Sequence, residues 1–358
     1  MSNKFTFLSL LGYYHSNDEK TLNLIAHKNR IKLQKISWQT FWENPAVIQL
    51  SDPVITLENN MECLQELKRR YPDLRIVNIE QSRHYFLGIN SVSFNIEDYA
   101  MRICRHLMQS GKKRATLFAS CYTRQYVKYH IEAFRRATMQ YGIELRDEDI
   151  FWDKSCTAIE CWDEIKPRLG KIDAVICNND QNAVFACKAA AESGFAVPWD
   201  IAITGRGQTC VSRITRPTIT TSFLDREELY NQVIKLCMYL YREPTIQTLD
   251  VTINHPLAIG ESSDINVCSK KEGRPNAISY KQWDPHIFGK VENLLKNSGS
   301  MTLSVVQKLI AGKTNQEIAN ELFVEERSVA YHIKKIKTIL CVSSKKDIVD
   351  AFLQLNIT

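Results

Sequence analysis

The sequence predicts an α/β protein with two lobes built on parallel sheets, followed by a C-terminal all-α module of four helices. Through residue 263, apolar runs of strand length alternate with segments of helical periodicity, which is typical of strands joined in parallel through helices. From residue 301 onward only helical periodicity remains. The number of strand–helix units before residue 263 favours two lobes over one sheet.

The predicted strands are short runs rich in apolar and β-branched residues, over residues 5–11, 32–37, 46–50, 75–79, 115–119, 174–178 and 201–204. Helices are predicted between most of them, including residues 97–110, 126–142, 183–194 and 226–241. Gly111, Gly142 and Gly194 directly follow helical patterns, where a glycine commonly ends a helix.

Composition and motifs exclude several classes of protein. No run approaches ~18 consecutive apolar residues, and the apolar run at residues 5–14 lacks a signal-peptide cleavage pattern, so we expect a cytoplasmic protein without membrane spans. The eleven cysteines form no Cys-x-x-Cys pair, and we expect small buried thiols in a reducing compartment. The sequence contains no Gly-rich phosphate loop, Gly-x-Ser-x-Gly elbow or His-Glu-x-x-His motif, so we expect no enzyme, no cofactor and no metal site.

The net charge of +6 is unevenly distributed. Residues 266–358 hold 14 Lys and Arg against 9 Asp and Glu, whereas residues 1–265 hold 32 against 31. The basic surplus therefore lies in the C-terminal quarter, where contact with a polyanion is expected.

A buried strand at residues 174–178 leads directly into Asn179-Asp180 and a helix. In open α/β sheets, ligands bind at the carboxyl ends of strands, and the first turn of a helix offers free N–H donors. Asp180 also fits the simpler role of a helix cap. The local pattern leaves both roles open.

Three segments, from Asp173, over residues 197–205 and over residues 215–221, resemble the effector-binding core of lac-repressor-type regulators. That core is similar to periplasmic sugar-binding proteins, so the resemblance implies a two-lobed, periplasmic-binding-protein-like sensor over residues 1–263, closing on a small molecule such as a sugar or sugar derivative. The candidate ligand contacts are Tyr13, His130, Asn179, Asp180 and Arg206.

Two of these positions depart from the family pattern. The family usually has an acidic residue where this chain has Gly205-Arg206-Gly207, and an arginine where it has His130. Loss of a carboxylate and of a bidentate guanidinium changes how ligand hydroxyls are held. Arg206 is compatible with an acidic ligand and equally with a side chain that points to solvent.

Residues 264–300 form the predicted linker. Residues 264–276 are polar and typical of a solvated connector, and a helix is predicted over residues 287–296, with Asp284 as its cap and Pro285 at its first position. Trp283 and Phe288 are expected to pack between domains.

The four helices of the C-terminal module, residues 301–358, are marked by caps and apolar spacing. Gly312 ends the first, near Ala311, and Thr314 with Glu317 forms a capping box that starts the second. A turn at residues 323–325 precedes the third. The inner positions of the third and fourth helices are Val329, Ile333, Ile336, Leu340, Ile348, Val349 and Phe352.

The outer face of the third helix has no acidic residue from Arg327 to Leu340. Its candidate DNA contacts are Arg327, Ser328, Ala330, Tyr331, Lys334, Lys335 and Lys337, and Thr314 with Asn315 is placed to meet a phosphate. On an isolated helix such lysines are usually only solvated charge. Here the cap, turn and basic helix occur in the order of a helix-turn-helix, which favours double-stranded DNA as a partner.

Residues 304–352 resemble the LuxR-type helix-turn-helix module, with matches at Gly312, residues 315–319, Leu322, Ser328-Val329, His332, Ile336, Leu340, Val342 and Lys345. The resemblance implies a homodimer that pairs through the last helix. Ala330 stands where a lysine is usual, and the acidic start of the first helix is absent.

These expectations combine into a ligand-responsive bacterial transcription regulator with a C-terminal DNA-binding domain, an order inverted relative to lac-repressor relatives. The alternative is a constitutive DNA-binding protein whose sensor-like domain serves only for dimerisation. Phosphorylation input is not expected, because Tyr13-Tyr14-His15 follows the first strand in place of an acidic cluster.

Overall fold

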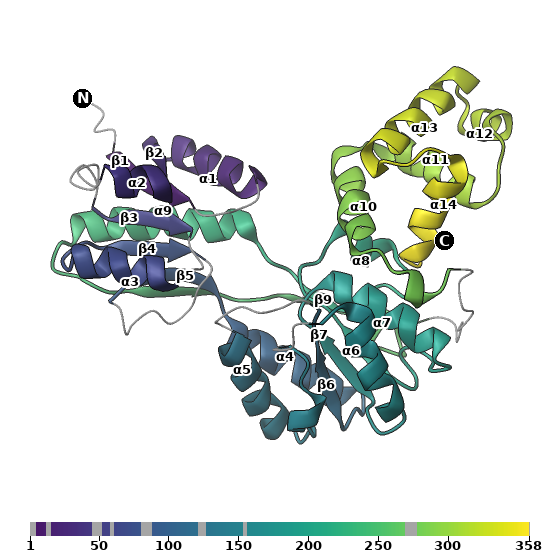
Figure 1. The fold of residues 1–358 in the computed structure, drawn as a ribbon, viewed down its shortest axis with the longest axis horizontal. Helices are drawn as coiled ribbons and strands as arrows, with labels where there is room; N and C mark the ends of the chain where they lie inside the picture. The colour runs from purple at the N-terminus through teal and green to yellow at the C-terminus, as the bar shows by residue number, and fades with distance from the viewer. Residues whose placement is uncertain are drawn as a thin grey trace. The chain divides into compact units, whose positions relative to one another are not determined.

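The computed structural model describes residues 5–11, 16–44, 52–57, 61–79, 88–120, 127–152, 156–268 and 278–357, and it divides into two compact units (Figure 1). The first unit comprises Met1–Asp98 and Leu224–His255, and the second comprises Tyr99–Phe223 and Pro256–Thr358. Residue 224 thus returns the chain to the first unit, and residue 256 resumes the second.

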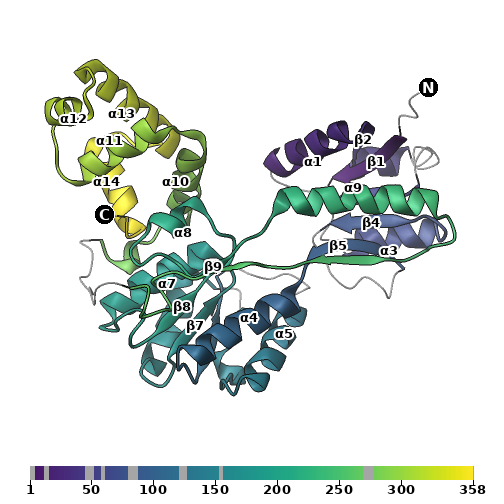
Figure 2. The same cartoon turned by 180° about the vertical axis from the view of Figure 1, so that it is seen from behind.

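The first unit is a parallel sheet with the strand order β10-β5-β4-β3-β1-β2. Its strands are β1 (Phe5–Leu11), β2 (Ile31–Ser37), β3 (Val54–Leu57), β4 (Ile76–Ile79), β5 (Asn90–Phe94) and β10 (Asp250–Ile253). Helices α1 (Ser16–Lys28) and α9 (Arg226–Arg242) bury one face, while α2 (Trp38–Glu43) and α3 (Met61–Arg70) bury the other (Figure 2). Covering both faces is what a parallel sheet requires.

The second unit contains a parallel sheet with the strand order β6-β7-β8 and a short antiparallel pair. The strands are β6 (Ala115–Phe118), β7 (Ala174–Cys177), β8 (Ala202–Thr204), β9 (Thr221–Ser222) and β11 (Leu257–Ala258). The helices are α4 (Ile96–Gln109), α5 (Val127–Gln140), α6 (Ala158–Ile165), α7 (Asp180–Glu192) and α8 (Cys210–Ile214), with 3-10 turns at η3 (Asp147–Asp149), η4 (Lys166–Arg168) and η5 (Tyr280–Gln282). Every residue of β6, β7 and β8 is buried.

The helical end of the chain belongs to this second unit. It consists of α10 (Pro285–Asn297), α11 (Ser300–Ile310), α12 (Asn315–Leu322), α13 (Glu326–Leu340) and α14 (Lys345–Gln354). Trp283 and Phe288 are buried in one apolar core with α7, and the Trp283 ring lies 5.4 Å from that of Phe185. They are therefore the packing anchors that the sequence predicts.

The structure differs from the sequence-based expectations in its strands and in the start of one helix. The strand expected at residues 46–50 lies outside the described residues, whereas the sequence pattern did not indicate β3, β5, β9, β10 and β11. Helix α7 begins at Asp180, three residues before the expected start, because the Asn179 side chain accepts the N–H of Asn182 (2.8 Å) and caps the helix.

One cysteine expectation is wrong. Cys156 and Cys161 form a disulfide: Cys156 directly precedes the cap of α6, Cys161 lies in its first turn, and the two Cα atoms are 6.0 Å apart. Among the other described cysteines, four are buried, namely Cys104, Cys177, Cys187 and Cys237. Within the described part of the chain, no helix combines the length and apolar character needed to cross a membrane.

Candidate nucleic-acid interface and ligand-binding edge

The start of α12 is fixed by the expected capping box. The Thr314 hydroxyl accepts the N–H of Glu317 (3.3 Å), and the Glu317 carboxylate accepts the N–H of Thr314 (2.7 Å). These hydrogen bonds from Thr314 lower the pKa of Glu317. The Thr314 hydroxyl also donates to Glu317 (2.8 Å), so its proton is already engaged within the protein.

The turn between α12 and α13 depends on a left-handed residue. Phe323 has φ 54°, and its side chain is 95% exposed. The N–H of Val324 donates to the carbonyl of Ala319 (3.0 Å), which closes the end of α12. The chain then enters α13 within a few residues, as a helix-turn-helix requires.

Helix α13 packs on its apolar face and exposes the opposite one. Val329, Ile333, Ile336 and Leu340 are buried as predicted, and His332 contacts Thr302 of α11 through its ring nitrogen (3.1 Å). The expected contact residues divide by exposure. Arg327, Ala330, Tyr331 and Lys334 are exposed, and Ser328, Lys335 and Lys337 are half-buried.

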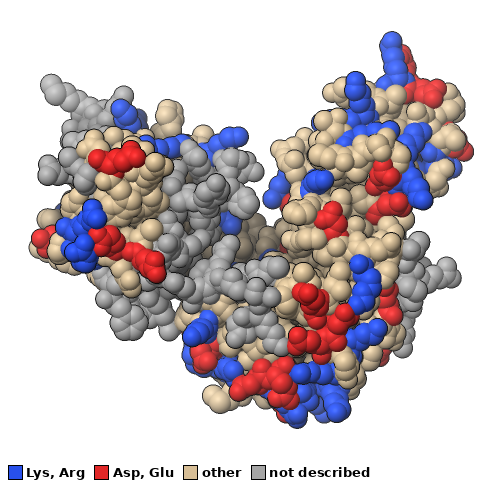
Figure 3. All heavy atoms as spheres, viewed as in Figure 1, with Lys and Arg blue, Asp and Glu red and all other residues tan. Residues whose placement is uncertain are grey.

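The cations of the helical end differ in whether a carboxylate already holds them. Arg327 pairs with Glu325, and both Lys308 and Lys313 pair with Glu321, whose pKa they lower. Among the described residues, no ion pair holds the lysines of α13, which are Lys334, Lys335 and Lys337. Figure 3 shows Lys and Arg side chains over this end, with carboxylates among them.

Asn315, the first residue of α12, is half-buried beside the exposed Thr314. Its side-chain oxygen is buried without a hydrogen-bond partner among the described residues. An oxygen is an acceptor and does not itself bind a phosphate. Any phosphate contact here must therefore come from the Asn315 amide N–H₂ group or from backbone N–H groups.

We call the residues that follow the ends of β6, β7 and β8 the carboxyl edge. They are Ser120, Asn178–Asp180 and Gly205–Gly207. Ser120 donates to Asn182 (2.8 Å), and the Asn182 amide donates to Asn178 (2.6 Å). Asn179 caps α7. The structure thus brings the ends of β6 and β7 together through side-chain hydrogen bonds, as expected of neighbouring parallel strands.

Asp180 has a role that the sequence pattern did not offer. It is only 1% exposed, and its carboxylate accepts the Thr209 N–H (2.7 Å) and the Thr221 hydroxyl. Burial raises the pKa of Asp180, and these hydrogen bonds oppose the shift. Asp180 is therefore neither the cap nor, in this structure, an exposed ligand contact; it joins the end of β7 to the loop after β8.

That loop approaches α7 so closely that Gly205 has no room for a side chain. A Cβ atom there would lie 2.6 Å from the Asp180 carboxylate and 3.1 Å from its Cα atom. The Asp180 N–H also donates to the carbonyl of Arg206 (3.1 Å). The backbone on either side of Arg206 is therefore held in place.

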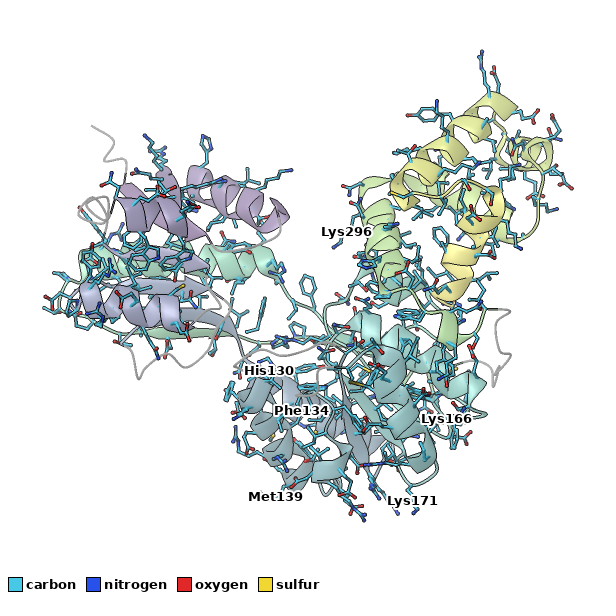
Figure 4. The ribbon with its side chains drawn as sticks, in the orientation of Figure 1. His130, Phe134, Met139, Lys166, Lys171 and Lys296 are labelled. Atoms are coloured by element: carbon cyan, nitrogen blue, oxygen red, sulfur yellow. A yellow bond between two sulfur atoms is a disulfide. The ribbon has the colours of Figure 1, made fainter. Side chains whose placement is uncertain are left out.

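His130 and Arg206 both contact one aromatic cluster formed by Tyr99, Phe134 and Trp152. The ring centroids lie 6.4 Å apart for His130–Trp152, 5.2 Å for Phe134–Trp152 and 5.6 Å for Tyr99–Phe134, and the Arg206 guanidinium lies 5.8 Å from the Tyr99 centroid. Figure 4 shows His130 and Phe134 on the same helix, α5. Two of the expected ligand residues are thus gathered by aromatic packing. Tyr13 lies outside the described residues.

One residue that connects the two candidate sites carried no sequence signal. Glu292 of α10 is 8% exposed and accepts the N–H groups of Cys210 (3.0 Å) and Val211 (2.9 Å), the first two residues of α8. It also pairs with Lys296 (3.1 Å), whose position on α10 is shown in Figure 4. A glutamate in the middle of a helical pattern ordinarily indicates a solvated position, so only the tertiary structure identifies this contact.

Comparison with known proteins agrees with this two-part construction. Residues 104–263 match the model of a periplasmic binding protein-like domain, and residues 302–352 match that of bacterial regulatory proteins of the luxR family. The class of protein is therefore a bacterial transcription regulator. In particular, it joins a periplasmic-binding-protein-like α/β domain, whose fold is similar to that of the lac repressor, to a C-terminal LuxR-type helix-turn-helix domain.

Individual relatives each cover about three quarters of the chain. The NTD biosynthesis operon regulator NtdR of Bacillus subtilis (strain 168) is 24% identical over 273 residues, covering 72% of this chain and 81% of NtdR. The lac repressor dimer bound to operator and the anti-inducer ONPF is similar with a TM-score of 0.60 at 16% identity, covering 73% of this chain and 95% of that one. The CelR–cellobiose complex has a TM-score of 0.57 at 15% identity, covering 74% and 86%.

Proposed function

We propose that the protein regulates transcription in response to a small molecule, a sugar or sugar derivative. Residues 1–263 bind the ligand, residues 264–300 link the domains, and residues 301–358 bind operator DNA as part of a cytoplasmic homodimer. The observation that carries the proposal is helix α13, which follows the capped helix α12 and its left-handed turn, and whose three lysines form no ion pair with any described residue. The CelR structure in complex with cellobiose and the lac repressor structure bound to operator support the classes of ligand and DNA.

Within α13, the early residues Ser328, Ala330 and Tyr331 contact base edges, and the lysines contact phosphates. Arg327 must exchange Glu325 for a phosphate in order to contribute. Thr314 and Asn315 position α12 against the backbone of the DNA through their N–H groups.

Ligand responsiveness requires a physical connection, and Glu292 supplies one. The loop that carries Arg206 runs through Thr209, the cap of α8, whose N–H is held by Asp180. Glu292 holds the next two N–H groups from α10, and α10 packs against α13. A ligand that displaces this loop alters the hydrogen bonds at the start of α8 and hence the position of α10. It acts only through its difference in affinity for the two arrangements.

The test uses full-length protein. Fragments enriched from sheared genomic DNA identify an operator, and fluorescence anisotropy then measures its affinity with and without sugars, sugar acids and nucleosides. Melting temperatures measured on the same protein show which of these compounds bind. A compound that binds and changes operator affinity at least fivefold supports the proposal.

The second candidate is a constitutive DNA-binding protein whose sensor-like domain only dimerises. It is favoured by the engagement of Asp180, Asn179 and Asn182 in internal hydrogen bonds. A compound that raises the melting temperature but leaves operator affinity unchanged, or a screen without any binder, supports this candidate instead.

A further inference from the structure

The feature that the proposed function leaves unexplained is the guanidinium of Arg206. Its Nε atom is buried without a hydrogen-bond acceptor, and among the described residues no carboxylate forms an ion pair with it. Its contact with the Tyr99 ring, at 5.8 Å, is a cation–π contact that supplies no hydrogen-bond acceptor. Arg206 as a whole is half-buried, and a buried N–H donor of this kind lowers stability unless another group satisfies it.

Other arginines of this protein form ion pairs with carboxylates. Arg114, whose side chain is 11% exposed, pairs with Asp149 (2.8 Å), and Arg168 pairs with the same carboxylate (3.0 Å). Arg75, 7% exposed in the first unit, pairs with Asp52 (3.1 Å). The fold thus supplies a carboxylate for these guanidinium groups, whereas no described carboxylate pairs with the half-buried Arg206.

The carboxylate nearest in the hydrogen-bond network does not neutralise Arg206. The Asp180 N–H donates to the Arg206 carbonyl, but the Asp180 oxygens are occupied by Thr209 and Thr221. Burial raises the pKa of Asp180, and these hydrogen bonds oppose that shift. Among the described residues, no ion pair joins Asp180 to Arg206.

A second donor on the same aromatic cluster also lacks an acceptor. The Trp152 indole N–H is buried without a hydrogen-bond partner among the described residues, and its ring packs on Phe134 and His130. Trp162, deep in the core, has an indole N–H in the same state, so Trp152 supports the observation on Arg206 without replacing it. The unpartnered groups of Arg206 and Trp152 are both donors.

We propose that the carboxyl edge of the second unit binds the anionic group of a small molecule, a carboxylate or a phosphate, through Arg206. This inference rests on the proposed function and narrows its ligand to an acidic sugar derivative, such as a sugar acid or a sugar phosphate. A planar guanidinium offers two parallel N–H donors that match both groups. Because the N–H groups of Gly205 and Gly207 donate to the carbonyls of Thr220 (2.8 Å) and Ser222 (2.9 Å), the backbone on both sides of the arginine is held in position before the ligand arrives.

The experiment compares the full-length protein with Arg206→Gln, Arg206→Lys and the control Arg213→Gln. Arg213 is exposed on α8, seven positions further along the chain, so its variant makes the same change of charge without touching the carboxyl edge. Melting temperature and calorimetric affinity are measured at matched ionic strength with gluconate and glucuronate, with glucose 6-phosphate and inorganic phosphate, and with glucose as the neutral probe.

We expect at least one anion to raise the melting temperature of the wild type and of Arg213→Gln. Its affinity should fall at least tenfold in Arg206→Gln and less in Arg206→Lys, which keeps the charge and loses the planar fork. The carboxylate and phosphate probes distinguish the two sources of negative charge. Without ligand, Arg206→Gln should melt no lower than Arg213→Gln, because an unpaired guanidinium does not stabilise the fold.

Three results overturn the inference: glucose binding as tightly as the anions, an anion affinity unchanged by Arg206→Gln, or no shift with any anion. A lower ligand-free melting temperature for Arg206→Gln than for the control also counts against it, since the arginine would then serve the fold. None of these readouts involves DNA, so a failure here is separate from a failure of operator regulation.

Discussion

The helical end and the carboxyl edge of β6–β8 use charge in opposite ways. On α13, the exposed Lys334 and the half-buried Lys335 and Lys337 form no ion pair with any described residue, so they remain available for the proposed contact with DNA. At the carboxyl edge most polar groups bond to each other, and no described carboxylate pairs with Arg206. The comparison indicates that a surface for a polyanion needs only cations on a rigid helix. A site for a small anionic ligand needs, in addition, a donor for which the protein supplies no acceptor.

The largest expected effect concerns the lysines of α13. Replacing Lys334, Lys335 and Lys337 by alanine should weaken operator binding roughly 100- to 1000-fold near 0.1 M salt and reduce the salt slope by about 3, since each phosphate contact contributes about 0.9. Anisotropy titrations over a range of salt concentrations measure both values.

The control for these lysines is the pair Lys308 and Lys313, which Glu321 already holds. Their double alanine variant should leave the salt slope within error of the wild type. Equal slopes for the two variants would mean that the ion pairs do not decide which cations meet DNA.

The next effect tests whether the two regions communicate. Glu292→Ala removes an acceptor for two N–H groups of α8, and we expect a loss of about 2–4 kcal/mol in the free energy of unfolding. Ligand binding should persist while its effect on operator affinity disappears. Chemical denaturation and anisotropy measure the two consequences.

Glu261 is the matched control for Glu292. It accepts the N–H (2.9 Å) and hydroxyl (3.2 Å) of Thr218, so Glu261→Ala also leaves a backbone donor unpaired without touching α10. It should lower stability and keep ligand regulation. Loss of regulation in both variants would attribute the effect to general destabilisation.

A smaller effect is expected from Gly205→Ala. The added Cβ atom would lie 2.6 Å from the Asp180 carboxylate, so the loop that carries Arg206 must shift, and overpacking of this kind lowers stability by about 1–3 kcal/mol. Gly289 on α10, where a Cβ atom meets nothing within 4 Å, provides the control. A Gly205→Ala protein as stable as Gly289→Ala would show that the close approach is dispensable.

The smallest effect is a difference in pH response between the two regions. Hydrogen bonds to the helix caps lower the pKa values of Glu317 and Asp347, so their stabilisation is present above the ordinary values of 4.5 and 3.8 and is lost as the pH falls through the lowered ones. Asp180, whose pKa is raised, behaves oppositely, because its contribution is present below 3.8 and is lost as the pH rises through the raised value. Amide hydrogen exchange between pH 3 and 6 should show α12 and α14 losing protection on acidification before β7 and β8 do. Uniform loss would contradict the contrast.

The helical end was largely predictable from sequence because its determinants are local. A capping box spans four residues, and the apolar spacing of Val329, Ile333 and Ile336 repeats along one helix. The carboxyl edge was not, because its geometry depends on residues far apart in sequence. Asp180 meets Thr221, and the aromatic cluster joins Tyr99 to Trp152, contacts that no local spacing reveals.

The contact between Glu292 and α8 also sets a limit on the dynamic range of regulation. If the ligand acts by disrupting two hydrogen bonds to a charged acceptor, the free energy available to shift operator affinity is confined to a few kcal/mol. Coupling energies of 1–3 kcal/mol correspond to about 5- to 150-fold changes in affinity. An induction ratio well above that range in cells would have to be built from several operators or from cooperative binding between dimers.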